Sequence, residues 1–235
     1  MEVENIKPGG YDFKEGEVLL FDKPYEWTSF DLVNKVRKLV RTALGVKKIK
    51  VGHAGTLDPL ATGLLIVCTG KATKTIDSYQ AKEKEYVATL KLGATTPSFD
   101  LETEIDAQYP TEHINRALID NTLEKFIGEL EQIPPAFSAV KVKGKRAYEL
   151  ARQGKVPDLK PKKLIISRIE VLEFYENQLV LRIVCSKGTY IRGLARDIGQ
   201  ALNSGAHLTA LKRTRIGLFI NENSMNIESF EKKLK

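Results

Sequence analysis

The sequence predicts a mixed α/β fold, because helical and strand-like patterns alternate along the chain. Residues 30–44 and 111–128 carry apolar side chains at helical spacing, whereas residues 85–92 alternate between two faces as a half-buried strand does. Residues 162–173 and 178–185 are two further strand-like runs separated by a short polar turn, which predicts a hairpin. Since the strands of a hairpin are antiparallel, the sheet cannot be purely parallel.

Both long helical patterns have recognisable start signals. Thr28 or Ser29, followed by Asp31, suits the start of the first helix. The second pattern is expected to begin at Thr111, as its cap. The apolar positions of the first helix are Phe30, Val33, Val36 or Arg37, Val40 and Leu44, which leaves Lys35, Lys38 and Arg41 on an outer face suited to contact phosphates.

Shorter elements are expected between these segments. Residues 16–22 form a short apolar run typical of a strand, and residues 63–69 form a longer run that suits a buried strand. A short helix is expected around residues 71–80. Residues 136–142 predict another strand, which ends at a turn around Lys143 and leads into a short helix.

The composition is that of an ordinary globular protein. The chain has 235 residues, of which 42% are hydrophobic and 29% charged. We expect a polar lead-in over residues 1–15 and one catalytic domain over residues 16–235. No apolar run approaches the roughly 20 residues that span a bilayer, and the first residues lack the plan of a signal peptide. A cytoplasmic location follows as an expectation.

Cysteine and histidine usage argues against disulfide and metal chemistry. Cys68 and Cys185 each lie in an apolar strand-like run without a neighbouring cysteine, which suits buried free thiols in a reducing compartment. His53, His113 and His207 are scattered singly, and their spacing resembles no metal-ligand set. We therefore expect no metal.

The charge distribution favours a nucleic acid as the partner. The net charge is +7, and residues 32–57 hold seven basic and no acidic residues. Residues 139–163 hold nine basic against two acidic residues, and residues 182–215 hold seven against one. By contrast, residues 98–131 hold nine acids against two bases, and the helical pattern within them at residues 111–128 is expected to face away from RNA. If the three basic segments converge, they form the electrostatic footprint of a nucleic-acid binder.

The most informative stretch is residues 51–70, VGHAGTLDPLATGLLIVCTG, in which a glycine-spaced polar loop runs into an apolar strand. Its glycines permit backbone conformations and close approaches that a side chain would block. Pro59 keeps the preceding Asp58 out of the helical region. Such a loop either presents the Asp58 carboxylate to a large partner or is a simple turn with an N-cap.

The run GHAGTLDPLATGLL closely resembles the central motif of the tRNA pseudouridine synthases of the TruB type, which isomerise a uridine in the T-loop of tRNA. The tracts DKPYEWTS, KEYVATLKLGATTPSFD, IPPAFSAVKVKGKRAYELARQG and KGTYIRGLARDIGQAL with GAHLTALKRTRIG resemble further segments of that family. Two positions depart from it. Glu26 and Thr103 stand where the family often has glycine, and Glu26 leaves the geometry of its turn open.

The resemblance implies three catalytic residues. Asp58 corresponds to the nucleophile, and Tyr86 to the tyrosine that stacks on the target base and is also a candidate to move the C5 proton. Arg192, which follows a tight turn at Gly188 in the first turn of a helix, corresponds to the partner of the catalytic aspartate. Without the resemblance, Tyr86 would be assigned to strand packing and Arg192 to the surface.

Four further residues are expected to contact the RNA or the uridine. His53 resembles the histidine that occupies space among the T-loop bases once the uridine is flipped; otherwise it is a hydrogen-bonded loop histidine. Leu211 resembles the residue that forms an apolar wall of the uridine pocket. The alternative, plain core packing, makes nearly the same physical claim for this side chain. Tyr190 lies beside Arg192 at the helix start, and Lys23 either supports the fold or contacts the substrate.

The implied fold is that of the pseudouridine synthases, a mixed and mostly antiparallel sheet with surrounding helices and a central basic cleft. Family members often add a small C-terminal RNA-binding domain. Only 24 residues follow Leu211, so we expect the short form without that domain, acting as a monomer.

The implied reaction breaks the N1–C1′ bond, turns the base over and rejoins it through C5, without a cofactor. Asp58 would attack either C6 of the base or C1′ of the ribose. A nearby arginine would offset the desolvation of this carboxylate and aim it. One alternative is a non-catalytic RNA-binding or tRNA-folding protein that uses the same cleft, and another is a small-molecule enzyme that binds phosphate on the glycine-rich loop.

Overall fold

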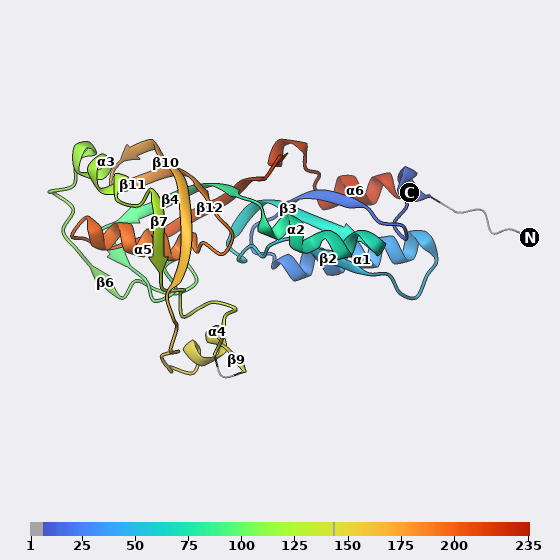
Figure 1. Ribbon diagram of the computed structural model, residues 1–235, viewed down its shortest axis with the longest axis horizontal. Helices are drawn as coiled ribbons and strands as arrows, with labels where there is room; N and C mark the ends of the chain where they lie inside the picture. The colour runs from blue at the N-terminus through green and yellow to red at the C-terminus, as the bar shows by residue number, and fades with distance from the viewer. Residues whose placement is uncertain (1–6, 143) are drawn as a thin grey trace, which may run out of the picture. The chain divides into compact units, whose positions relative to one another are not determined.

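The computed structural model describes residues 7–142 and 144–235, which form two compact units. Unit 1 comprises Met1–Lys84 with Lys212–Lys235, and unit 2 comprises Glu85–Leu211. Strand β12 (Ala206–Ile216) passes from unit 2 into unit 1 (Figure 1). Whether the two units act as one catalytic domain stays a prediction.

Unit 1 is built around one central strand. Its elements are β1 (Val18–Lys23), α1 (Ser29–Leu44), β2 (Val51–His53), β3 (Ala61–Thr69), α2 (Ile76–Ala81), β13 (Phe219–Ile220) and α6 (Ile227–Lys233), with short 3₁₀ turns at Pro8–Gly10, Gly70–Thr75 and Asn221–Asn223. Both β1 and β2 pair antiparallel with β3, and the end of β12 pairs antiparallel with β13. The strands expected at residues 16–22 and 63–69 are therefore confirmed, and residues 70–81 form the short helical segment.

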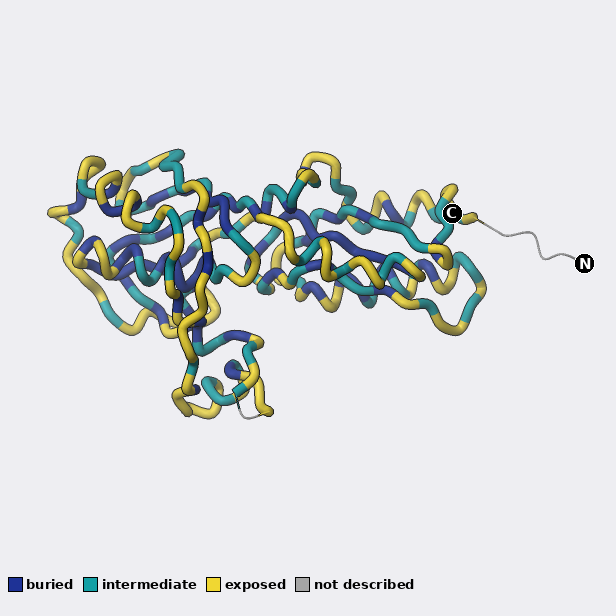
Figure 2. Tube along the Cα trace, viewed as in Figure 1, coloured by how far each residue is buried: buried dark blue, intermediate teal, exposed yellow. Residues whose placement is uncertain are grey.

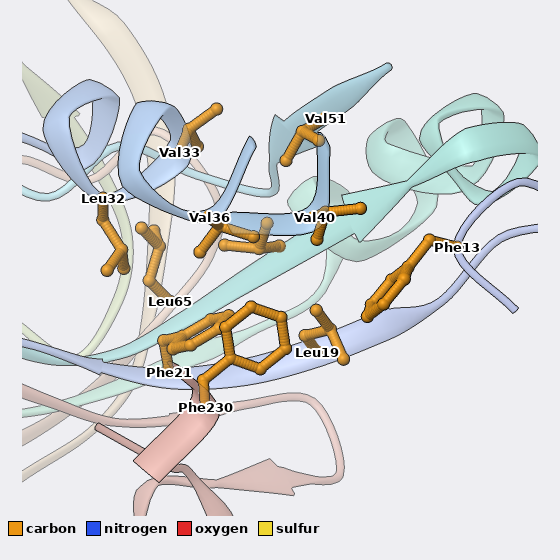
Figure 3. Packing of buried hydrophobic residues seen from close by; sticks show 11 residues of the cluster. Phe13, Leu19, Phe21, Leu32, Val33, Val36, Val40, Val51, Leu65 and Phe230 are labelled. Atoms are coloured by element: carbon orange, nitrogen blue, oxygen red, sulfur yellow. The ribbon is translucent and has the colours of Figure 1, made fainter. Parts of the chain in front are cut away.

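Strand β3 is buried on both faces, which explains its continuous apolar sequence. Leu65 and Val67 point to a cluster that α1 and α6 cover, whereas Leu64 and Ile66 point to a second cluster with Ile76 of α2. The first cluster contains Phe13, Leu19, Phe21, Leu32, Val36, Val40 and Phe230, most of them labelled in Figure 3. In Figure 2 the same strand is dark blue along nearly its whole length.

Helix α1 begins as the sequence predicts, and the predicted apolar positions Val33, Val36 and Val40 are buried, but Phe30 is not. The Thr28 side chain accepts a hydrogen bond from the Asp31 amide, and the Asp31 carboxylate accepts one from the Thr28 amide, which completes a capping box. Phe30, expected on the buried face, is 61% exposed. Leu32 takes a place in the core instead, because it lies one turn before Val36.

Unit 2 contains a sheet that runs β12–β4–β11–β10–β7. Its elements are β4 (Lys84–Leu92), β5 (Ala94–Thr95), β6 (Ala107–Gln108), α3 (Arg116–Glu124), β7 (Gly128–Gln132), β8 (Lys141–Val142), β9 (Lys145–Arg146), α4 (Ala147–Ala151), β10 (Lys162–Tyr175), β11 (Gln178–Cys185) and α5 (Ile191–Ala201). Strand β10 pairs antiparallel with both β7 and β11. Together with the antiparallel pairs of unit 1, these ladders confirm the mixed, mostly antiparallel α/β class.

The predicted strand faces and hairpin of unit 2 are confirmed. Burial alternates along β4, with Tyr86, Ala88, Leu90 and Leu92 buried. Tyr175 of β10 pairs with Gln178 of β11, so the hairpin loop has two residues. These are Glu176 and Asn177, both with positive φ, as tight hairpin turns of this length require.

Three local expectations are wrong. The second helix is shorter than residues 111–128, and its cap is Asn115, whose side chain accepts a bond from the Leu118 amide, rather than Thr111. Residues 128–132 leave the helical pattern because they pair with β10 as strand β7. Within residues 136–142 only Lys141–Val142 is a strand, and the expected turn at Lys143 lies outside the described residues.

The polar lead-in contributes an aromatic side chain to the core of unit 1. Phe13 is fully buried, and its ring meets that of Phe230 at an edge-to-face angle of 83°. Residues 1–6 lie outside the described part of the chain. Both cysteines are buried, as the sequence predicts. In the described chain no helix is long and apolar enough to cross a membrane.

Candidate active site

The loop that carries Asp58 lies in unit 1 and joins β2 to β3. The Ala54 amide donates to the Ile66 carbonyl at 2.9 Å, which fixes the start of the loop against β3. The Ala61 amide donates to the Asp58 carbonyl at 3.1 Å, which closes a turn over Pro59 and Leu60. Asp58 itself is half-buried.

Lys23 supports this loop from the end of β1. Its side chain is fully buried, and its ammonium donates to the carbonyls of Pro24 at 2.8 Å, Trp27 at 2.5 Å and Pro59 at 3.2 Å. Burial lowers the pKa of Lys23 to about 8, although the Asp58 carboxylate acts in the opposite direction. Of the two roles considered for Lys23, the structure favours fold support, because its three donors are directed at backbone carbonyls.

Ser29, the first residue of α1, holds the residue next to Asp58. Its hydroxyl accepts from the Leu57 amide at 2.8 Å and donates to the Leu57 carbonyl at 3.1 Å. Both groups are buried. The backbone on each side of Asp58 is thus fixed, by Ser29 before it and by Lys23 after it, so the carboxylate starts from a defined position.

His53 lies at the end of β2, opposite Val67 of β3. Burial lowers the pKa of its imidazole, and the positive charge of Arg213 lowers it further. Its Nδ1 is buried without a hydrogen-bond partner in the described part of the chain. The ring is therefore kept neutral at physiological pH, which suits contact with RNA bases better than with phosphates.

Arg192 lies in unit 2, in the first turn of α5, and is 4% exposed. Its guanidinium donates to the Ser98 carbonyl at 3.2 Å and to the Phe137 carbonyl at 2.9 Å. Its Nε lies 3.6 Å from a carboxylate oxygen of Asp100. Because Arg192 is buried, it is not a surface residue. Its carbonyl and carboxylate partners offset the cost of burying a guanidinium.

Asp100 is a site residue that the sequence reasoning missed. It lies in the acidic segment 98–131, is 6% exposed, and has a carboxylate oxygen 3.6 Å from Nε of Arg192. Thr103, which stands where the family often has glycine, accepts a bond from the Ser98 amide at 3.1 Å and so closes the same turn. The signal available in the sequence was an aspartate enclosed by apolar neighbours.

Gln132, at the end of β7, is a second missed residue. Its side-chain amide donates to the Tyr190 carbonyl at 3.1 Å and accepts from the Tyr190 amide at 2.9 Å. Gln132 thus pairs with the backbone at the start of α5 as a neighbouring strand would. Tyr190 is the N-cap residue of that helix and is half-buried, so Gln132 fixes the point from which Arg192 projects.

Tyr86 and Leu211 lie on neighbouring strands of unit 2, β4 and β12. Tyr86 is 9% exposed, as packing in the strand requires, and Leu211 is half-buried. The candidate residues are divided between the two described units. Asp58, His53 and Lys23 belong to unit 1, whereas Tyr86, Arg192, Tyr190 and Leu211 belong to unit 2.

The two sets of residues have complementary chemistry. Unit 1 offers a carboxylate on a fixed loop with a neutral imidazole on the preceding strand, and unit 2 offers an aromatic ring, an apolar side chain and an oriented guanidinium. In the described ranges no group of three or more histidine, cysteine or acidic side chains could hold a metal ion. Carboxylates serve as nucleophiles in covalent catalysis, and aromatic rings stack on planar bases.

Comparison with known proteins agrees with this description. The solved structure of a "Cbf5-Nop10-Gar1 Complex" matches 99% of this chain with a TM-score of 0.71 and 28% sequence identity, and this chain spans 60% of that one. The fold and the matching family model define the chain as a pseudouridine synthase. More narrowly, the chain belongs to the TruB family of pseudouridylate synthases, whose N-terminal domain model matches residues 41–191.

Further similarity covers nearly the whole chain. A model of the tRNA pseudouridylate synthase B C-terminal domain matches residues 192–235. The tRNA pseudouridine synthase B of Phocaeicola vulgatus is 66% identical over 93% of both chains. That of Parabacteroides distasonis is also 66% identical, over 88% of both chains. The family expected from the central motif is confirmed.

Proposed function

We propose that this protein isomerises uridine 55 in the T-loop of tRNA to pseudouridine, with Asp58 as the nucleophile. The observation that carries the proposal is the anchoring of the Asp58 loop, in which buried polar side chains fix the backbone on both sides of one half-buried carboxylate. A turn without catalytic use has no need of such supports. The tRNA substrate is supported by the names of close relatives.

In this mechanism the target uridine leaves the T-loop and enters the site, where Tyr86 stacks on the base and Leu211 forms an apolar wall. Arg192 pairs with the Asp58 carboxylate and offsets the cost of enclosing it. This step requires Asp58 of unit 1 to meet Arg192 and Tyr86 of unit 2 around one nucleotide. His53 fills the space that the flipped base leaves.

Asp58 then attacks C6 of the base or C1′ of the ribose, which leads to cleavage of the N1–C1′ bond. The base turns and rejoins C1′ through C5, and the bond to Asp58 breaks, which regenerates the carboxylate. The C5 proton leaves, with Tyr86 as the candidate acceptor, and N1 takes up one proton. Atoms and charge balance without an oxidant, a reductant or an activated co-substrate. We therefore expect the reaction to need no cofactor. We also expect the enzyme to act in the cytoplasm and as a monomer.

The test uses an unmodified tRNA transcript and measures pseudouridine at position 55. The wild type should convert the transcript, and Asp58→Asn should bind it but form no product. Asp77→Asn, which neutralises an exposed carboxylate on α2, is the matched control and should keep full activity. A transcript with cytidine at position 55 controls for the position of the product.

Three outcomes would overturn the assignment in whole or in part. Tight tRNA binding by the wild type without any pseudouridine would favour the alternative function, a non-catalytic RNA-binding or tRNA-folding protein. Product formation by Asp58→Asn would contradict only the assignment of Asp58 as the nucleophile, and the pseudouridine synthase activity would stand. If the protein binds a phosphate-bearing small molecule with an affinity that neither salt nor added RNA changes, a small-molecule phosphate-binding enzyme would be favoured.

A further inference from the structure

Arg213 is buried in unit 1 although it belongs to a basic segment that was expected to face RNA. It lies on β12 and is 1% exposed, and it heads the largest fully buried side chains of the described residues. Burial of a guanidinium is costly unless its donors are satisfied. A fully buried arginine beside a reactive loop therefore calls for a structural reason.

The Arg213 side chain connects the start of the Asp58 loop to strand β3, into which the loop runs. Its Nε donates to the Leu64 carbonyl at 2.8 Å, and its Nη2 donates to the Gly55 carbonyl at 3.0 Å. These carbonyls lie three residues before and six residues after Asp58 in the sequence. The planar guanidinium thus closes the loop at its base, with two donors in fixed directions.

Two glycines shape the backbone near Arg213. A Cβ at Gly63 would lie 2.3 Å from the Arg213 carbonyl oxygen, so only glycine lets β3 approach the backbone of β12 here. Gly55, whose carbonyl Arg213 binds, has φ +100, which side chains rarely adopt. Gly63 therefore permits the close approach of the two strands, and Gly55 permits the backbone conformation at the carbonyl that Arg213 binds.

We propose that Arg213 is a positioning residue for the reaction, which fixes the Asp58 carboxylate by holding the Gly55 and Leu64 carbonyls together. The proposal rests on the proposed function of Asp58. Its mode of action is distinct from that of Lys23 and Ser29, which hold single points next to Asp58. Arg213 instead sets the width of the loop base, and hence the direction in which the loop leaves the sheet.

Lysine cannot replace arginine in this role. A lysine keeps the positive charge and much of the apolar stem, but its single ammonium is a point donor without the fixed fork of a guanidinium. Arg213→Lys therefore separates the geometric role from the charge. Lys212→Met is the matched control, because it removes an exposed positive charge from the adjacent position of the same strand.

The experiment combines two readouts on the full-length protein. Single-turnover pseudouridine formation and equilibrium affinity are measured with the same tRNA transcript, for the wild type, Arg213→Lys and Lys212→Met. Arg213→Lys should lower the single-turnover rate by about 100-fold, as a misplaced reacting group does, with the dissociation constant within about threefold of the wild type. Lys212→Met should keep the wild-type rate at saturation.

Hydrogen–deuterium exchange without RNA supplies the second readout and does not depend on activity. Arg213→Lys should raise exchange in residues 54–64, while residues 29–44 of α1 keep their protection. A wild-type rate for Arg213→Lys, or a loss of rate explained entirely by weaker binding, would overturn the proposal, as would unchanged exchange in the loop. A wild type that forms no product would refute the proposed function instead, and the exchange data would still decide whether Arg213 fixes the loop.

Discussion

Glu26 occupies a backbone conformation that favours glycine. Its φ is +66, in the left-handed region, and it lies in the turn between Lys23 and α1. The turn therefore keeps its shape although the family often has glycine here, and the chain bears the cost of a side chain at positive φ. Of the two departures from the family pattern, this one has a direct energetic consequence.

We expect Glu26→Gly to raise the free energy of unfolding by about 0.5 to 1 kcal/mol, because it relieves the left-handed strain. Urea denaturation at constant pH measures the change. Glu26→Ala is the control, since it removes the same charge but keeps a Cβ, and it should bring no gain. Equal stabilisation by both variants would show that charge, rather than backbone conformation, is responsible.

His53 makes the stability of unit 1 depend on pH. Burial, helped by the Arg213 charge, lowers the pKa of His53 from its ordinary value of 6.5 in the folded state. When the pH falls below 6.5, the unfolded chain binds a proton at this residue before the folded protein does. The stability that neutral His53 contributes is therefore complete above pH 6.5 and is lost as the pH falls toward the lowered pKa.

His53→Gln should consequently flatten the stability profile between about pH 7.5 and 5. Urea denaturation across that range, in parallel with the wild type, measures the slope. His113→Gln changes an exposed histidine and should leave the wild-type slope in place. If His53→Gln and the wild type lose stability equally on acidification, some other group controls the acid response.

At the scale of elements, prediction succeeded where a segment's own pattern decides its structure. The alternation of residues 85–92 and the capping signal at Thr28 and Asp31 are local, and both are confirmed. Strand β7 could not be predicted because its pairing with β10 decides its structure, and β10 lies outside the local stretch of sequence from which β7 would be predicted. The face of α1 was misjudged at Phe30 for the same reason, since the partners of that face come from β1, β3 and α6.

The candidate site shows the same division. Asp58 and Arg192 could be found because each lies in a tract that resembles the family. Their supports could not, because Asp100, Gln132 and Arg213 act on residues 58 or more positions away or through backbone carbonyls. A carbonyl carries no signal in the sequence, so a residue that binds one looks like any other polar residue.

Gln132 offers a test of how α5 is positioned. Gln132→Glu replaces the group that donates to the Tyr190 carbonyl with a carboxylate, which repels that carbonyl and the nearby Asp197. We expect a loss of about 1 to 3 kcal/mol in the free energy of unfolding and a lower single-turnover rate, since Arg192 shifts with the helix start. Thermal unfolding and pseudouridine formation measure the two effects.

Gln200→Glu makes the same chemical change at the exposed end of α5 and serves as the control. It should change neither stability nor rate appreciably. Should Gln132→Glu keep the wild-type rate despite reduced stability, the backbone of Tyr190 would not be what orients Arg192 for the reaction.

At the scale of the whole molecule, the three basic segments contain both buried and exposed cations. Arg192 and Arg213 are buried and bind carbonyls, so they stabilise the fold rather than attract phosphates. The first segment has exposed cations on α1, at Lys38 and Arg41, and a denser group after it, where Lys47, Lys48 and Lys50 precede the strand that ends at His53. This loop is the part of unit 1 best suited to contact the phosphate backbone near the target nucleotide.

The double variant Lys47→Ser/Lys48→Ser should therefore weaken tRNA binding and make it less dependent on salt. Each lost phosphate contact reduces the slope of log K against log salt by about 0.7 to 0.9, so two contacts reduce it by about 1.5. The single-turnover rate at saturating enzyme should stay at the wild-type value, because no reacting group changes. Lys232→Ser/Lys233→Ser removes the same charge from exposed positions on α6, outside the three segments, and should leave the slope unchanged. Equal effects of the two pairs would mean that net charge alone, rather than the loop before β2, attracts the RNA.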